Sequence, residues 1–211
     1  GLEKYIMTKL FSRTFSSSLE DEKIDNEISE KICLLQTFLK PQHLDIPPSL
    51  HNEPSWLLAE KELLKMNAFK APHEKVMCIM NCCRVINNLL LNAATSEHVP
   101  TGADEVHFTL AFDTNFFLLI FHFQANPPKL HSNLKFIKLY RRQAKLISEA
   151  EYYFTNLVSA KSFIVDLNAK SLSMDEIKFE ENMQAAKLTN KVTSESSSTC
   201  QLNQQEKNML V

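Results

Sequence analysis

The chain has 211 residues, of which 44% are hydrophobic, so it is long and apolar enough to bury the core of one helical domain. A net charge of −2 and an isoelectric point near 6.4 exclude the basic surface by which proteins bind nucleic acid. Only two glycines are present, at positions 1 and 102, which excludes phosphate-binding loops and dinucleotide-binding motifs and favours helices over hairpins. We therefore predict an all-α protein.

The five cysteines are odd in number and unpatterned, which is typical of a reducing compartment. Cys78 and Cys82 lie one helical turn apart, but no second pair of cysteines or histidines stands at the spacing that zinc requires. The first residues are charged and amphipathic, unlike a secretory signal. We expect a cytoplasmic protein with no metal and no cofactor, and we interpret the start without methionine as truncation or processing.

Apolar spacing predicts two helices at the start of the chain, over residues 2–15 and 20–39. The second has apolar residues at steps of three and four, and three acidic residues lie near the positive end of its dipole. These apolar residues are Ile24, Ile28, Ile32, Leu35 and Leu39, and the acids are Glu20, Asp21 and Glu22. Four prolines between residues 41 and 54 rule out a continuous helix there, so we expect an ordered connector.

Three further helices are predicted over residues 56–66, 75–92 and 106–124. The second of them has the strongest periodicity, with a stripe formed by Val76, Ile79, Met80, Cys83, Ile86 and Leu90. The third is heavily apolar and ends before two prolines. We interpret it as a buried core helix. The alternative, an interfacial or membrane role, would place Asp113 and other polar side chains in hydrocarbon.

The remaining elements follow from capping signals and periodicity. Ser132 is expected to cap a helix that runs toward Tyr140, and helical spacing predicts another helix over residues 152–167. The capping box at residues 173–176 starts a last helix that reaches about Lys187 and presents a solvated acidic face. Serine, threonine, glutamine and asparagine dominate residues 190–211, which we expect to be a disordered tail.

Two short blocks contain the candidate functional residues. In the first, Asp104 follows Gly102, which can bend the backbone outward; position alone favours the interpretation of this acid as an N-terminal helix acid stabilised by the dipole. In the second, Tyr152 and Tyr153 are adjacent on a helix and therefore point about 100° apart. We predict that Tyr153 faces the core and Tyr152 faces outward, although both are also compatible with ordinary packing.

These blocks, at residues 102–105 and 151–157, flank a third at residues 125–133 that reads Ala-Asn-Pro-Pro-Lys-Leu-His-Ser-Asn. Together with the segments at residues 2–5, 55–59 and 85–93 they resemble the vacuolar-protein-sorting-nine (Vps-nine) domain, and most closely its plant members. The resemblance implies a helical bundle divided into truncated N-terminal helices with a connector (residues 1–54), a catalytic core (residues 55–189) and the polar tail. It also implies that an apolar stripe around Tyr5, Ile6 and Leu10 is exposed.

The resemblance further implies a guanine-nucleotide exchange factor for Rab-five-group GTPases. It would bind these GTPases in their GDP-loaded and nucleotide-free forms. Its partners would recruit it to endosomes. The family pattern assigns the role of an aspartate finger to Asp104, with Glu105 beside it, and assigns GTPase contact to Tyr152 and Thr155. Three residues apart is one helical turn, so Tyr152 and Thr155 share a face.

One departure from the family pattern leaves a second function open. The segment between Glu105 and Ala125 is about two turns longer than in the family and lacks an early proline, and Asp113 lies closer than Asp104 to the expected spacing from Ala125. A displaced acid would lose much of its effect. The alternative is therefore a catalytically weak or inactive Rab-binding module, and a third possibility is a helical scaffold without GTPase contact.

Overall fold

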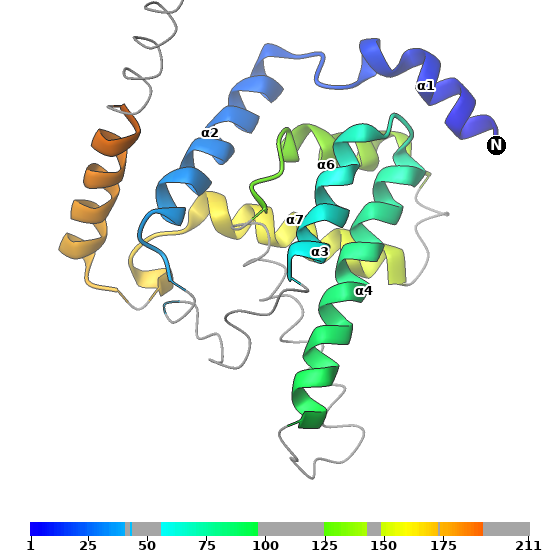
Figure 1. Ribbon diagram of the computed structural model, residues 1–211. Coiled ribbons are helices and arrows are strands. Elements are labelled where there is room, and N and C mark those ends of the chain that lie inside the picture. Colours follow the sequence, from blue (N-terminus) through cyan, green and yellow to red (C-terminus); the bar gives the residue numbers. More distant parts are fainter. Residues whose placement is uncertain (41–42, 44–55, 97–124, 143–148, 173, 192–211) are drawn as a thin grey trace, which may run out of the picture.

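The computed structural model describes residues 1–40, 43, 56–96, 125–142, 149–172 and 174–191. Across these ranges the regular structure is entirely helical and contains no strand, which confirms the all-α prediction (Figure 1). The predicted helix over residues 106–124 lies outside the described residues, as does nearly all of the connector at 41–54. The last helix runs to Lys191, so the predicted tail is described only for its first two residues.

Two helices open the chain, α1 (Leu2–Thr14) and α2 (Leu19–Gln36). The side chain of Ser18 caps α2 by accepting a hydrogen bond from the backbone N–H of Glu20 at 3.1 Å. The predicted apolar stripe of α2 is confirmed, because Ile28, Ile32 and Leu35 are all buried in the main core. This stripe makes α2 part of the same core as the helices that follow.

The next two helices form a hairpin through a short 3-10 helix. α3 (Trp56–Leu64) is followed by η3 (Lys65–Ala68) and then by α4 (Pro72–Ser96), which lies beside α3 and extends beyond the neighbouring helices (Figure 1). Both helices were predicted, and the predicted stripe of α4 is confirmed. The buried residues are Trp56, Ala59 and Leu63 on α3, and Val76, Ile79, Cys83, Ile86 and Leu90 on α4, where Met80 is half-buried.

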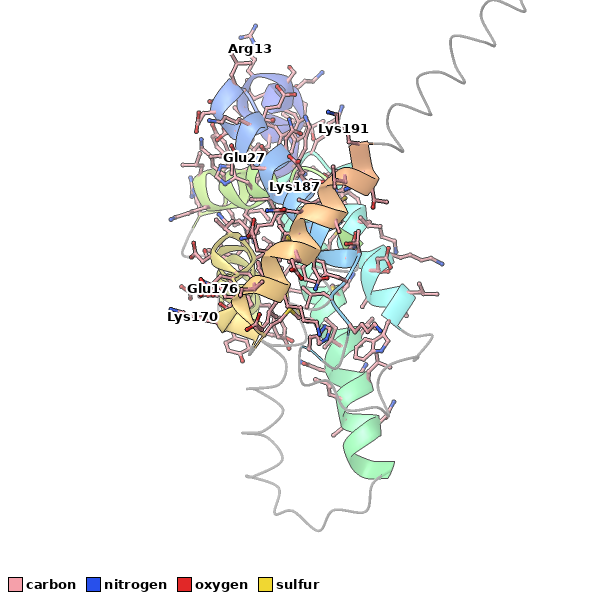
Figure 2. All side chains as sticks on the ribbon, turned by 90° about the vertical axis from the view of Figure 1, so that its left-hand side faces the viewer. Arg13, Glu27, Lys170, Glu176, Lys187 and Lys191 are labelled. Atoms are coloured by element: carbon pink, nitrogen blue, oxygen red, sulfur yellow. The ribbon has the colours of Figure 1, made fainter. Side chains whose placement is uncertain are left out.

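The second half of the structure contains α6 (Leu130–Tyr140), α7 (Glu149–Asp166), η5 (Lys170–Leu172) and a C-terminal helix over residues 176–191. The C-terminal helix is attached at the end of α2, where the rings of Phe38 and Phe179 meet edge to face at 5.8 Å between centroids. Its outer surface is charged, as Glu176, Lys187 and Lys191 in Figure 2 illustrate.

The prediction that Ser132 caps α6 is wrong. The helix begins at Leu130, after Lys129 adopts a left-handed backbone with φ of 55°, so Ser132 already lies in the first turn. The cap comes from another helix: the carboxylate of Asp25 on α2 accepts the backbone N–H of Ser132 at 3.1 Å and also its hydroxyl. Asp25 is itself buried, and its negative charge lies at the positive end of the α6 dipole.

Asp21 lies in the first turn of α2, as predicted, and it also has a partner on another helix. It is buried and accepts two hydrogen bonds from Lys135 Nζ, at 2.7 and 2.9 Å. These hydrogen bonds hold the pKa of Asp21 below its usual value. The capping box predicted at residues 173–176 needs correction: the C-terminal helix begins at Glu176, and its cap is Asp175, which accepts the N–H of Lys178 at 3.0 Å.

α1 has exposed apolar residues, and its first turn is fastened to the rest of the molecule. Tyr5, Ile6 and Leu10 are 67%, 40% and 40% exposed, which confirms the predicted stripe. In the first turn, Glu3 accepts the backbone N–H of His73 at 3.1 Å and pairs with Arg141 at 2.6 Å. The first residues of the chain thus cap α4 and neutralise a nearly buried guanidinium.

A buried cation joins α1, α4 and α6. The ammonium of Lys75, whose residue is fully buried, donates to the carbonyl of Met66 at 2.8 Å and to Asn133 Oδ1 at 2.7 Å. Three aromatic rings surround it, with centroids 4.7 to 5.8 Å away: Phe11, Phe15 and Phe136. Cation–π attraction to these rings compensates in part for the loss of hydration.

Candidate functional site

The first two turns of α7 divide the predicted site residues as expected. Tyr152 is 41% exposed while Tyr153 is only 6% exposed, and Thr155 is exposed one turn beyond Tyr152. Phe154 and Leu157 are buried in the core, so this part of the helix is held firmly while its outer face stays open. We call the outer face formed by Tyr152 and Thr155 the tyrosine–threonine face.

Two polar contacts hold α7 against α4 next to this face. Asn87 Nδ2 donates to the hydroxyl of Tyr153 at 2.7 Å, and Arg84 Nη2 pairs with Glu149 Oε2 at 3.0 Å. Burial raises the pKa of the Tyr153 phenol, and the hydrogen bond that Arg84 donates to Glu149 raises the pKa of the Arg84 guanidinium. Both groups therefore keep their protons at neutral pH, and the two contacts persist there.

The rings of Tyr152 and Tyr153 touch. Their centroids are 5.5 Å apart and their planes are tilted by 57°. Because Tyr153 is buried and its hydroxyl is fixed by Asn87, the exposed ring of Tyr152 rests against an anchored one. A phenol in this position offers apolar contact area while its hydroxyl stays near water.

The block at residues 125–133 serves the fold. Asn126, in a left-handed conformation with φ of 35°, donates to the carbonyl of Ser29 at 3.3 Å. Asn133 is fully buried, where its amide nitrogen donates to Asn67 Oδ1 and to the Lys129 carbonyl while its oxygen accepts from Lys75. These contacts shape the turn into α6, and they depend on partners in distant parts of the chain.

Asp104 and Glu105 lie outside the described residues, so their expected positions stay predictions. The three cysteines of α4 are buried thiols: burial raises the pKa of Cys78 to about 11 and that of Cys82 to about 12. Over the part of the chain that the structure describes, no group of three or more His, Cys, Asp or Glu side chains is placed to hold a metal ion.

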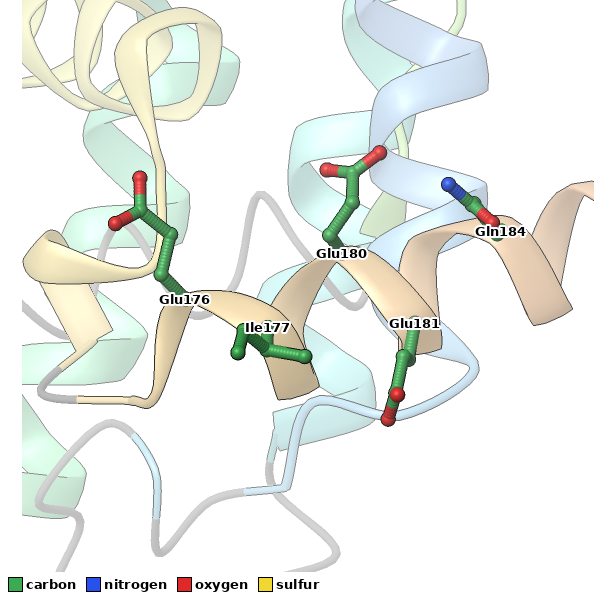
Figure 3. A pocket seen from close by; sticks show the side chains of 5 residues that line it. All are labelled: Glu176, Ile177, Glu180, Glu181 and Gln184. Carbon is green, nitrogen blue, oxygen red and sulfur yellow. The ribbon is translucent and has the colours of Figure 1, made fainter.

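A depression along the C-terminal helix is lined by Glu176, Ile177, Glu180, Glu181 and Gln184 (Figure 3). All five side chains come from one helix, and the three carboxylates are exposed. This agrees with the predicted solvated acidic face. Like charges on a single helix repel one another and prefer water, so this depression has the character of open surface.

The middle of the chain matches a known protein family. Residues 56–169 match the Vacuolar sorting protein 9 (VPS9) domain, which is more than half of the chain. The protein therefore belongs to the VPS9 domain family, as its three blocks predicted. The match runs from the first residue of α3 to Ala169, three residues past α7, and includes both Tyr152 and Thr155.

Individual relatives extend this likeness beyond the domain. Vacuolar protein sorting-associated protein 9A is 53% identical in Arabidopsis thaliana and 54% identical in Oryza sativa subsp. japonica, each over 89% of this chain. The Rab5 GDP/GTP exchange factor of Homo sapiens is 31% identical over 86% of this chain. The chain spans 35%, 38% and 36% of these three relatives, respectively, about a third of their length.

In the ranges that the structure describes, every helix is too short or too polar to span a bilayer.

Proposed function

We propose that this chain is a guanine-nucleotide exchange factor for a Rab GTPase of the Rab-five group, acting in endosomal and vacuolar trafficking. The observation that carries the proposal is the outward-facing pair Tyr152 and Thr155, anchored on a rigid part of α7 inside the VPS9 match. The name of the human relative, a Rab5 GDP/GTP exchange factor, supports the same activity.

In this proposal the tyrosine–threonine face binds the switch region of the GTPase. Tyr152 supplies apolar area and a hydroxyl at low conformational cost, because its ring already rests on Tyr153. Thr155, one turn further along the same face, supplies a short polar group. A pre-oriented pair of this kind suits a partner that must be held while its nucleotide leaves.

Asp104, with Glu105 beside it, is proposed to act on the nucleotide. By linkage, a protein that binds the nucleotide-free GTPase more tightly must weaken nucleotide affinity by the same factor. The phosphates are held by a magnesium ion and a lysine, so a carboxylate brought there competes for the same positive charges. Two unit charges 4 Å apart interact by about 4 kcal/mol at an effective dielectric of 20, which is enough for a large change in affinity.

The division of the chain and its location are part of the proposal. Residues 1–54 would form the end of a helical bundle, residues 55–189 the catalytic core and residues 190–211 a disordered tail. The protein would work in the cytoplasm and reach endosomal membranes through its partners. Neither a metal nor a cofactor of its own is needed, because the exchange reaction changes no covalent bond in the protein.

The test is release of fluorescent GDP from a purified Rab-five-group GTPase, measured with the full chain. We expect rapid release by the wild type, and a loss of about 10²-fold for Asp104→Ala with binding of the nucleotide-free GTPase retained. Asp113→Ala is the matched control, because it removes an acid from the unusual segment nine positions later. Tyr152→Ala is expected to weaken binding itself.

The other outcomes separate the alternatives. Tight binding of the nucleotide-free GTPase without faster release by the wild type supports the inactive binding module. A loss with Asp113→Ala and none with Asp104→Ala assigns the finger to the other acid. If the wild type neither binds any Rab GTPase nor accelerates release, the proposed function is wrong.

A further inference from the structure

We propose that Asn87 and Tyr153, supported by Arg84 and Glu149, form a clamp that sets the orientation of the tyrosine–threonine face. Tyr153 and Asn87 are positioning residues in this proposal, acting through Tyr152 and making no contact with the partner. The proposal rests on the proposed function, since it concerns how that face engages the GTPase.

The two polar contacts are matched in spacing. Arg84 and Asn87 are three residues apart on α4, and Glu149 and Tyr153 are four residues apart on α7. Each pair therefore occupies one helical turn, and the contacts advance in the same direction along the two helices. Two such contacts one turn apart define the rotation of α7 about its axis as well as its position along α4.

The apolar core shared by α4 and α7 restricts the rotation of α7 about its axis less sharply than the two polar contacts do. The core cluster includes aliphatic and thiol side chains of these two helices, such as Cys83, Ile86 and Leu157, whose apolar contacts are non-directional. A hydrogen bond has a narrow range of distance and angle, so the 2.7 Å contact between Asn87 and the Tyr153 hydroxyl allows far less rotation. The exposed ion pair at the first turn adds direction more than stability.

The clamp reaches the candidate site through one ring contact. Tyr153 is 6% exposed and cannot itself present a surface to a partner. Its ring packs against the ring of Tyr152, with the two centroids 5.5 Å apart. Loss of the hydroxyl anchor frees Tyr153 to shift, and the ring of Tyr152 shifts with it. Small displacements of an oriented group reduce its effect on a partner far more than they reduce folding stability.

The decisive variant is Tyr153→Phe, which removes the hydroxyl and keeps the buried ring. We expect the second-order rate of GDP release to fall about tenfold while the chain stays folded. In a Tyr152→Ala background the same change should have less than a twofold effect, because the clamp acts through the ring that is already absent. Tyr5→Phe on the exposed face of α1 is the matched control and should leave release unchanged.

The ion pair gives a second, independent measurement. Arg84→Glu should slow release by roughly threefold, as expected for an exposed pair, and the exchange Arg84→Glu with Glu149→Arg should restore the rate. Circular dichroism and thermal unfolding of every variant establish the folded fraction at the assay temperature. Rates are compared per folded molecule.

The results separate this proposal from the proposed function. Suppose that the wild type accelerates GDP release from the GTPase while Tyr153→Phe slows that release by the same factor with and without the Tyr152 ring. In that case the clamp has only a structural role and the inference is wrong. It is also wrong if Tyr153→Phe has no effect. A wild type that neither binds nor accelerates release overturns the proposed function and this inference together.

Discussion

At the scale of single residues, Lys75 is the most demanding group in the protein. It is a fully buried cation on α4 that contacts two oxygens and three aromatic rings, and in the ranges that the structure describes no carboxylate forms an ion pair with its ammonium. Burial lowers its pKa from 10.5 to about 8. The group is therefore close to losing its proton in the folded protein while it stays charged in the unfolded chain.

This shift predicts a pH dependence of stability with a definite sign. Between about pH 8 and 10.5 the unfolded state binds more protons at Lys75 than the folded state, so this group's contribution to the free energy of unfolding rises with pH. We subtract the free energy of unfolding of Lys75→Met from that of the wild type. This difference is expected to rise by about 1 kcal/mol from pH 7.5 to 9.

The measurement is urea unfolding of both proteins at several pH values, with identical buffers. Lys138→Met, which removes an exposed lysine of α6, is the matched control for the loss of one positive charge. A flat difference for Lys75→Met would mean that the aromatic rings keep its pKa near that of a free lysine.

At the scale of helices, the start of α6 depends on a cap from a distant part of the chain. Asp25 on α2 lies 107 residues before Ser132 and accepts both its backbone N–H and its hydroxyl. The C-terminal helix is capped locally by exposed Asp175 instead. A buried charged acceptor leaves unsatisfied donors when removed, whereas water replaces an exposed cap.

We therefore predict unequal effects for two equivalent substitutions. Asp25→Ala should lower the free energy of unfolding by about 2 to 3 kcal/mol, and Asp175→Ala by about 1 kcal/mol or less. Equilibrium unfolding in urea, with equal m values as a check, measures both. Equal losses would mean that water reaches the first turn of α6 when Asp25 is removed.

At the scale of the whole molecule, one core joins the N-terminal helices to the region that matches the VPS9 domain. Ile28, Ile32 and Leu35 of α2 belong to the same cluster as the buried residues of α4, α6 and α7. Figure 1 shows α2 running beside α6 and α7, with α1 across the end of the molecule. The matched residues 56–169 therefore lack one wall of their own core.

This architecture also explains which predictions from sequence succeeded. The stripes of α2 and α4, the outward direction of Tyr152 and the inward direction of Tyr153 depend on spacing within one helix, and spacing is visible in the sequence. The cap from Asp25 and the burial of Lys75 depend on partners that only the fold brings close. α4 starts at Pro72, earlier than predicted, and proline at the first helical position is a local signal for that start.

The shared core predicts how the chain tolerates shortening. A fragment of residues 55–191 loses the buried aliphatic residues of α2, each worth about 1.5 to 3 kcal/mol, which together approach the whole stability of a typical domain. We expect it to lack a cooperative thermal transition. A fragment of residues 16–191 loses α1, whose only fully buried residue is Met7, together with its polar contacts.

The second fragment should therefore still unfold cooperatively, at a temperature several degrees below that of the full chain. Circular dichroism at 222 nm and calorimetry of all three chains measure this directly. A cooperative transition in the 55–191 fragment would show that the matched region closes its own core, and the N-terminal helices would then be an attached layer. Loss of cooperativity on removal of α1 alone would instead place the cluster around Lys75 among the contacts on which the whole fold depends.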